Sequence, residues 1–262
     1  NGNDFSSKGS WQNKVLFIAD DGDGNEHMKQ AEILSTIVDT SLDNLNISKI
    51  YVDAFIKENT PSGTTVKGVN RDIDKQITDG TLLINYTGHG GEYGWGSERF
   101  LNIQDILRFK NKTKLPLLMT ATCEFSRFDD PGRRSAGEYM FLQKDGGAIA
   151  LFTTVRLVFS IPNFNLNKNF YKVLIEEQNS ETVRIGDIFR KTKIKNNAGT
   201  NDRNFTLLGD PAIRLAIPKK TIFVDSIVAW NKQPIDTLKS LTQATIHGHI
   251  ENSNSVTQTN FN

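Results

Sequence analysis

The chain has 262 residues, of which 37% are hydrophobic and 23% are charged, and 31 basic against 30 acidic residues leave a net charge of +1. This composition is typical of a globular protein with one substantial core. The balance of charge argues against a general affinity for nucleic acid or anionic membranes. No apolar run approaches the roughly 18 residues of a membrane-spanning helix, and no signal peptide is recognisable.

The first part of the chain alternates apolar runs with helical patterns. Residues 14–20 form an apolar strand candidate that ends in acidic residues, and residues 26–42 follow with apolar side chains at helical spacing. A second strand is expected at 48–56, and a short helix at 69–80 that ends with glycine.

The alternation continues to about residue 217. Further strands are expected at 81–88, 115–122 and 147–154, and further helices at 102–111, about 135–145, 167–178 and 181–196. Apolar strands separated by helices predict an α/β fold, in which helices cover both faces of a mainly parallel central sheet.

The two ends of the chain differ from this pattern. Residues 1–13 are expected to be an N-terminal tail that precedes a main domain over residues 14–217. After Pro218 the sequence shows alternation and turn residues without a convincing helix. Residues 218–262 are therefore expected to begin a β-rich, sandwich-like module, or else to pack as strands on the main domain, because about 40 residues rarely form a stable sandwich alone.

Polar side chains that could take part in catalysis or binding lie at or just past the carboxyl ends of five of the expected strands. They are Asp20, Asp21, Asp53, His89, Cys123 and Arg156. In parallel sheets the ligand crevice lies at the carboxyl ends of the strands. These side chains are therefore expected to gather on one edge of the sheet.

His89 and the only cysteine, Cys123, form the strongest pair in this set. A free cysteine is only a few per cent thiolate at neutral pH, so a nucleophilic cysteine needs an imidazole beside it. Taken singly, Cys123 also fits a small buried hydrophobe and His89 a turn residue. Their joint placement after two strands favours a nucleophile and its base, and the single cysteine excludes an internal disulfide.

The acidic segment ADDGDGNE, residues 19–26, raises the question of a metal. Three of its oxygen-bearing residues and one residue beyond it fall near the spacing of an EF-hand loop, with positions 1, 3, 5 and 12 taken by Asp21, Asp23, Asn25 and Glu32. Glu26, however, occupies the position where that loop requires glycine. The favoured interpretation is an acidic loop that caps the following helix, with a structural calcium ion as the alternative.

The strand ending in TGHGG and the later strand ending in ATC resemble the gingipain family of caspase-like (clan CD) cysteine peptidases. Further blocks follow in the order of that family over about residues 14–217: LFIADDGDGNEHMKQAE, YVDAF, INYTGHGGEYGWGSERFL, LMTATCEFSRFDDP, GGAIALFTTVRLVFS and NFTLLGDPAIRL. The likeness is greatest to PorU-type sortases of bacterial type IX secretion. The phrase DTLKSLTQATIHGHIEN resembles the start of the β-rich region that follows their peptidase domain.

The resemblance implies a caspase-like fold and a set of catalytic roles. Cys123 would be the nucleophile, His89 the general base and then acid, and the backbone N–H groups of Gly90 and Cys123 the oxyanion hole. Asp53, at the end of what is expected to be the neighbouring strand, is the candidate to orient the imidazole, with a solvated loop acid as the alternative.

Glu92, Trp95 and Arg156 are expected to wall the substrate groove, although Trp95 also fits a packing role. Arg156 would favour an acidic group or a C-terminal carboxylate, whereas Glu92 would favour a basic residue. The turn CEFSRFDD, residues 123–130, is expected to be ion-paired and to seat the cysteine without a catalytic role for its charged side chains.

The resemblance further implies protein or peptide substrates, no cofactor, and a place outside the cell or at the bacterial surface. A sortase-like enzyme would cleave C-terminal sorting signals of secretion cargo, near outer-membrane partners. The alternatives are a general secreted protease and an inactive caspase-like binding or assembly module. A nucleotide-binding crevice is disfavoured, because GHGGEYG lacks the G-x-G-x-x-G pattern.

Overall fold

The computed structural model describes residues 8–61, 63–178, 180, 183–197, 199–218, 220–231, 233–252 and 255–261. The chain divides into two compact units, Asn1–Ile217 and Pro218–Asn262. No helix in the described part of the chain has the length and apolar character needed to cross a bilayer.

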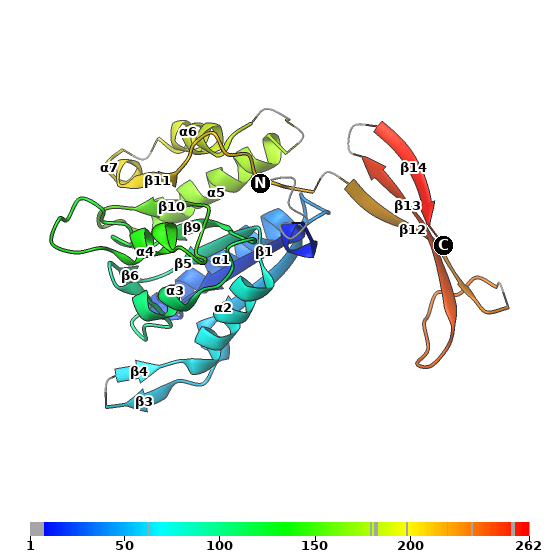
Figure 1. The fold of residues 1–262 in the computed structure, drawn as a ribbon, viewed down its shortest axis with the longest axis horizontal. Coiled ribbons are helices and arrows are strands. Elements are labelled where there is room, and N and C mark those ends of the chain that lie inside the picture. The colour runs from blue at the N-terminus through cyan, green and yellow to red at the C-terminus, as the bar shows by residue number, and fades with distance from the viewer. Residues whose placement is uncertain are drawn as a thin grey trace. The chain divides into compact units, whose positions relative to one another are not determined.

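A six-stranded sheet forms the centre of the first unit (Figure 1). Its strands are β1 (Lys14–Ala19), β2 (Asn46–Tyr51), β5 (Leu83–Thr87), β9 (Leu117–Ala121), β10 (Ala150–Thr154) and β11 (Phe205–Gly209). They lie in the order β11-β10-β9-β5-β1-β2, and β11 alone among these six runs antiparallel to its neighbour. The prediction of a mainly parallel sheet is confirmed.

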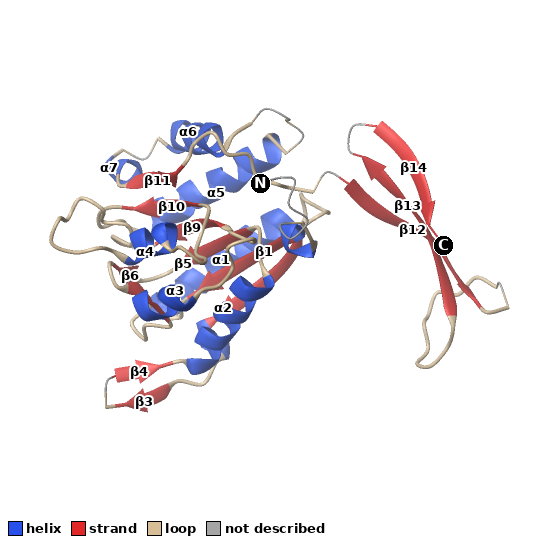
Figure 2. Cartoon of the chain, in the orientation of Figure 1, coloured by secondary structure: helices blue, strands red, loops and turns tan. Residues whose placement is uncertain are grey.

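Helices cover both faces of this sheet (Figure 2). One face carries α1 (Gly22–Asp39), α5 (Ser160–Glu176) and α6 (Ile185–Asn196), and the other carries α2 (Lys67–Asp79), α3 (Ile103–Arg108) and α4 (Ala136–Leu142). Successive residues of a strand point to opposite faces. Phe17 of β1 thus packs in one core with Leu34 of α1, and Leu16 in the other with Ile73 of α2.

Short elements complete the unit. They are the 3-10 turns Ser10–Asn13 and Val52–Ala54, the hairpin of β3 (Glu58–Thr60) and β4 (Gly63–Thr65), the small sheet of β6 (Gly90–Gly91), β7 (Gly94–Trp95) and β8 (Leu101–Asn102), and helix α7 (Thr200–Arg203). The small sheet begins at Gly90, so it lies directly after His89 in the chain.

Several predicted element ends are wrong. The strand expected over 48–56 ends at Tyr51, where a 3-10 turn begins, and α5 starts at Ser160 rather than 167. Pro162 lies in this added first turn, a position that tolerates proline because its N–H would have no helical partner. The edge strand β11 was not predicted at all. Residues 181 and 182 of the helix expected over 181–196 lie outside the described residues.

The predicted N-terminal tail is partly structured. Trp11, in the turn Ser10–Asn13, is buried and belongs to the same core as Phe17. An indole ring buries more apolar area than most side chains, which explains why this turn joins the main unit. Residues 1–7 of the expected tail lie outside the described residues.

The second unit is a three-stranded antiparallel sheet of β12 (Lys220–Ala229), β13 (Ala244–Asn252) and β14 (Ser255–Phe261). Large apolar side chains such as Ile222, Val224 and Trp230 are exposed on this unit. In its described residues this unit thus consists of strands joined by turns.

Candidate active site

The loops after β5 and β9 lie side by side at the carboxyl edge of the sheet. These two strands are parallel neighbours, and Thr87 at the end of β5 is paired with Ala121 at the end of β9. His89 and Cys123 each follow two residues after this last pair. A methyl group built on Gly90 would lie 2.8 Å from Oγ1 of Thr122, so the two loops are in contact. The structure thus brings the histidine loop and the cysteine loop together.

The backbone of His89 is held from two sides. Its N–H donates to Oδ2 of Asp20 at 2.5 Å, and its carbonyl accepts from the Tyr86 hydroxyl at 2.5 Å and from the N–H of Gly96 at 2.9 Å. Asp20 is almost fully buried, and its other oxygen, Oδ1, accepts a hydrogen bond from the N–H of Gly22 at 3.3 Å. Burial, reinforced by the Asp20 carboxylate, holds the pKa of Tyr86 well above its ordinary value, so this hydroxyl stays a donor.

The imidazole of His89 lies against the first turn of α1. Its side chain is 50% exposed, and Nε2 lies 3.3 Å from Oδ2 of Asp23. A methyl group on Gly22 would lie 2.7 Å from Cδ2 of this ring, so only glycine permits the observed approach. The ring of His27, also from α1, meets the His89 ring edge-on with centroids 5.0 Å apart.

Cys123 is half-buried in a tight turn between β9 and α4. Its Sγ lies 3.5 Å from the carbonyl oxygen of Val158. Glu124, the next residue, has a left-handed backbone with φ of 46°, and its N–H donates to the carbonyl of Arg156 at 3.4 Å. Ser126 donates its N–H to the carbonyl of Thr154 at 2.9 Å. The turn that carries the thiol is therefore fastened to the end of β10 and the loop after it.

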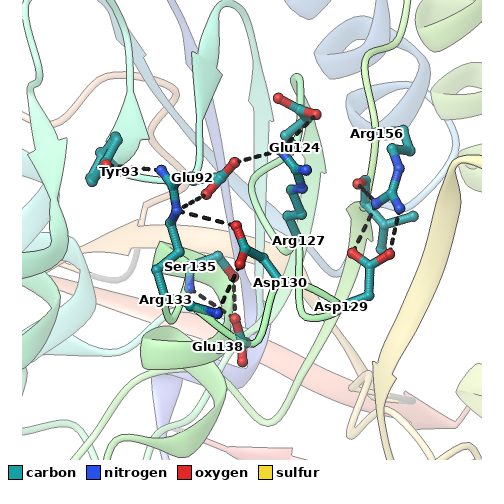
Figure 3. Close-up of polar contacts among 12 residues, drawn as sticks. Glu92, Tyr93, Glu124, Arg127, Asp129, Asp130, Arg133, Ser135, Glu138 and Arg156 are labelled. Atoms are coloured by element: carbon teal, nitrogen blue, oxygen red, sulfur yellow. Dashed lines mark hydrogen bonds and ion pairs between the residues drawn. The ribbon is translucent and has the colours of Figure 1, made fainter.

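Ion pairs surround this turn (Figure 3). Glu92 lies between Arg127 and Arg133, with oxygen–nitrogen distances of 3.0 Å and 3.3 Å. Arg156 pairs with Asp129 through both terminal nitrogens of its guanidinium group. The predicted ion-paired turn is confirmed, and the helix that follows it begins with a capping box of Ser135 and Glu138.

The position assumed for Asp53 is wrong. It lies in the 3-10 turn after β2, and its side chain is exposed. The prediction took its strand to be the neighbour of the strand before His89, but β1 lies between β2 and β5. The carboxylate that contacts the imidazole belongs to Asp23 instead.

Of the three residues predicted to line the substrate groove, Trp95 is a buried aromatic, and Glu92 and Arg156 are charged residues in ion pairs. Trp95 is 1% exposed and stacks on Tyr86 with centroids 4.3 Å apart, so its predicted place on the groove wall is wrong. It supports the His89 loop from the core instead. Glu92 is nearly buried and engaged by two arginines, whereas Arg156 is exposed beside Asp129.

The EF-hand-like spacing does not produce a common oxygen cluster. Glu32 accepts from Lys49 and Tyr51 at 2.8 Å, and Asp21 pairs with Lys57 at 2.8 Å. Hydrogen bonds to Asp21 and Glu98 raise the pKa of Lys57 to about 12. The carboxylates of Glu32 and Asp21 therefore pair with lysines and do not join Asp23 in one cluster.

Sequence reasoning missed three residues that contact His89, which are Asp23, His27 and Tyr86. Asp23 lies in the acidic segment that was interpreted as a helix cap, and His27 lies in the helix expected over 26–42. Helical spacing could not reveal their contact, because Asp23 has a left-handed backbone ahead of the regular helix. Tyr86 gave no signal, because its contact with the backbone of His89 depends on a loop that returns over the end of β5.

The fold and the adjacent histidine and cysteine loops place the chain among caspase-like α/β proteins. The sequence model of Peptidase family C25 matches residues 2–216, and the chain belongs to this family. The resemblance to gingipains drawn from the sequence is thereby confirmed.

Two kinds of relative support this assignment. Gingipain R1 of Porphyromonas gingivalis is 25% identical over 163 residues, covering 57% of this chain and 16% of that protein. The crystal structure of the Arg-specific cysteine proteinase gingipain R (RgpB) has a TM-score of 0.64 at 18% identity, covering 94% of this chain and 55% of that one. The complex of the P. gingivalis RgpB pro- and mature domains gives 0.66 at 17% identity, with 94% and 56% covered. The chain thus spans little more than half of these solved relatives, which are similar to it in fold.

Proposed function

We propose that this chain acts as a cysteine endopeptidase in which Cys123 attacks a peptide carbonyl and His89 moves the proton. The observation that supports this most is the register of β5 and β9, whose last paired residues each precede one of the two groups by two positions. The thiol is half-buried and the imidazole half-exposed. Both groups are therefore at the edge where a substrate chain can reach them.

The chemistry follows from these two side chains. The imidazole takes the thiol proton, and the thiolate attacks the carbonyl carbon to give a tetrahedral intermediate. The N–H groups of Gly90 and Cys123 are the proposed donors to the oxyanion. Collapse of the intermediate expels the amine, which takes its proton from His89 and leaves an acyl group on the cysteine sulfur. Water, activated by the same imidazole, then releases the acid.

We assign the orienting role to Asp23 rather than to Asp53. Its carboxylate lies at Nε2 of His89, which leaves the other ring nitrogen to exchange a proton with the thiol. A carboxylate in this place also stabilises the imidazolium that forms during attack. Asp20 accepts a hydrogen bond from the backbone N–H of His89 and so fixes the position of the backbone from which the imidazole extends.

The test is cleavage of protein substrates by Cys123→Ala and His89→Ala variants, together with alkylation of the thiol by iodoacetamide. Each variant should lose activity by about 10³-fold or more, as removal of a nucleophile or its base does elsewhere. Thiol labelling should slow in the His89 variant and vanish in the Cys123 variant, while thermal unfolding stays near that of the parent chain. Cleavage that persists in Cys123→Ala would assign the activity to another site. A folded parent chain that neither cleaves nor labels would favour the inactive binding module.

Within this activity we propose a sortase-like role outside the cell, in which the acyl group passes to an amine instead of water. Its support is the sequence likeness to PorU-type sortases over the peptidase blocks and the following β-rich segment. C-terminal sorting signals of type IX cargo are the substrates that this role implies. Added glycinamide or another small amine should divert product from acid to amide in a sortase. A general secreted protease would give predominantly the acid at the same amine concentrations.

A further inference from the structure

His27 is a buried imidazole without a hydrogen bond. It is 5% exposed, and neither ring nitrogen has a hydrogen-bond partner. Burying a polar group without compensation is unfavourable by a few kcal/mol, so such groups in native proteins call for an explanation. The proposed peptidase mechanism does not use this ring, although it touches the ring of His89 edge-on.

Ligand atoms from three residues converge at this point. One side-chain atom each of Asp20, His27 and His89 lies within 4.8 Å of the others. Oδ1 of Asp20 is 4.0 Å from Nε2 of His27, and Oδ2 of Asp23 is 3.5 Å and 3.3 Å from Nε2 of His27 and His89. Two ligands at about 2.1 Å from a tetrahedral zinc ion lie roughly 3.4 Å apart. The two Asp23 distances match this spacing, and the Asp20–His27 distance of 4.0 Å is somewhat longer.

The donor set suits a transition metal. Imidazole nitrogens favour zinc and its neighbours, whereas calcium takes six or more oxygens. The two aspartates supply negative charge, and among the described contacts of the Asp20 carboxylate there is no lysine or arginine. Lys57, the cation of this loop, pairs with Asp21 and Glu98 instead.

The backbone of α1 places Asp23 over the two rings. Asp23, Gly24 and Asn25 have left-handed φ values of 53°, 64° and 65°, after which the regular helix begins. This loop lets Asp23 contact both His27, four residues later, and His89 in the loop after β5. A fourth ligand is thus available on the solvent side, where the Asp23 side chain is 58% exposed.

We propose that Asp20, His27 and His89, with Asp23 as the outer ligand, form a Zn²⁺ site that switches the peptidase off. Zinc bound to the Nε2 lone pair of a neutral His89 leaves the proton on the other ring nitrogen. That nitrogen then has no lone pair to accept the thiol proton, so Cys123 is not activated. The inhibition rests on the proposed role of His89, but the binding of metal does not.

Isothermal titration of ZnCl₂ into the chain carrying Cys123→Ala tests the binding without a thiol ligand. We expect one zinc per chain, with affinity weakened by about 100-fold or more when His27→Gln is added, since even residues that only support a ligand matter 10- to 100-fold. His249→Gln is the matched control, because His249 is flanked by Asp225 and Glu251 in the second unit and its loss should leave the affinity unchanged. Binding that disappears in Cys123→Ala, or that is lost with His249 instead of His27, would overturn the site.

A second measurement addresses the switch. In the chain with an intact thiol, Zn²⁺ should inhibit cleavage at the concentration at which it binds, and a chelator should restore the activity. The His27→Gln variant, compared with its own metal-free rate, should need about 100-fold more zinc. Equal sensitivity of both chains would show that zinc acts elsewhere. A chain that binds zinc but has no activity would overturn the proposed peptidase function and leave the metal site standing.

Discussion

The two sides of the candidate active site are built differently. The imidazole side consists of Asp20, Gly22, His27, Tyr86 and His89, and it depends on a few contacts with buried side chains. Neither ring nitrogen of His27 makes a hydrogen bond. The thiol side, the turn of residues 123–130 with its arginine partners, is surrounded by several partly exposed ion pairs. Exposed ion pairs contribute little singly, whereas a buried charge bound to backbone N–H groups contributes more. Substitutions should therefore affect the imidazole side more strongly.

The largest effect is expected for Asp20→Ala. The change removes the buried carboxylate that accepts from the N–H groups of His89 and Gly22, and the loss of these two charge-assisted hydrogen bonds should lower the free energy of unfolding by about 3 kcal/mol. Displacement of the His89 loop should also lower kcat/KM by about 10²-fold. Urea unfolding and peptide cleavage measure the two. Asp21→Ala, which loses only an ion pair with Lys57, is the control and should change stability by less than about 1 kcal/mol.

Gly22→Ala should displace the His89 ring while leaving the free energy of unfolding almost unchanged. Its new methyl group would lie 2.7 Å from Cδ2 of His89, and because this side chain is half-exposed the ring can move aside. We expect kcat/KM to fall by about 10-fold or more with a change in unfolding free energy below about 1 kcal/mol. Gly132→Ala, on an exposed turn near the thiol side, should leave both quantities unchanged. Full activity of Gly22→Ala would mean that the ring position is not critical.

A smaller effect is expected for Glu92→Gln on the thiol side. The carboxylate is shared by Arg127 and Arg133, whose guanidinium groups keep access to water when it is lost. The free energy of unfolding should fall by about 1–2 kcal/mol. Glu58→Gln, which breaks an exposed pair with Lys67, should have almost no effect on the same urea curve. A loss as large as that of Asp20→Ala would contradict the contrast between the two sides.

The smallest effect concerns Arg156. Its hydrogen bonds to Asp129 lower the pKa of that carboxyl. Because the folded-state pKa is lowered, the pair stabilises the fold above the ordinary carboxyl pKa of about 3.9, and this contribution is lost as the pH falls through the lowered value. NMR titration of Arg156→Gln should show the pKa of Asp129 rising toward the ordinary value. The pKa of Asp187, lowered in the same way by Arg184, should stay where it is; an unchanged Asp129 would refute the pairing in solution.

Much of this architecture could be predicted because it depends on local patterns. The apolar runs at β1, β5, β9 and β10 and the helical spacing between them identify a parallel α/β sheet, and that sheet type puts the strand ends on one edge. His89 and Cys123 were found this way, since each follows directly after such a run. The ion-paired turn could be predicted from its sequence, CEFSRFDD, because acidic and basic residues lie close together in it.

Only the tertiary structure decided which strands are neighbours. The sequence contains no local signal that β1 lies between β2 and β5, and this order moves Asp53 away from His89 and brings the first turn of α1 to it. Trp95 was misplaced for the same reason, because its burial depends on the stack with Tyr86 below the loop. The candidate pair of His89 and Cys123 was thus determined by the sequence, whereas the groups around the imidazole were determined by contacts between distant segments, which no periodicity encodes.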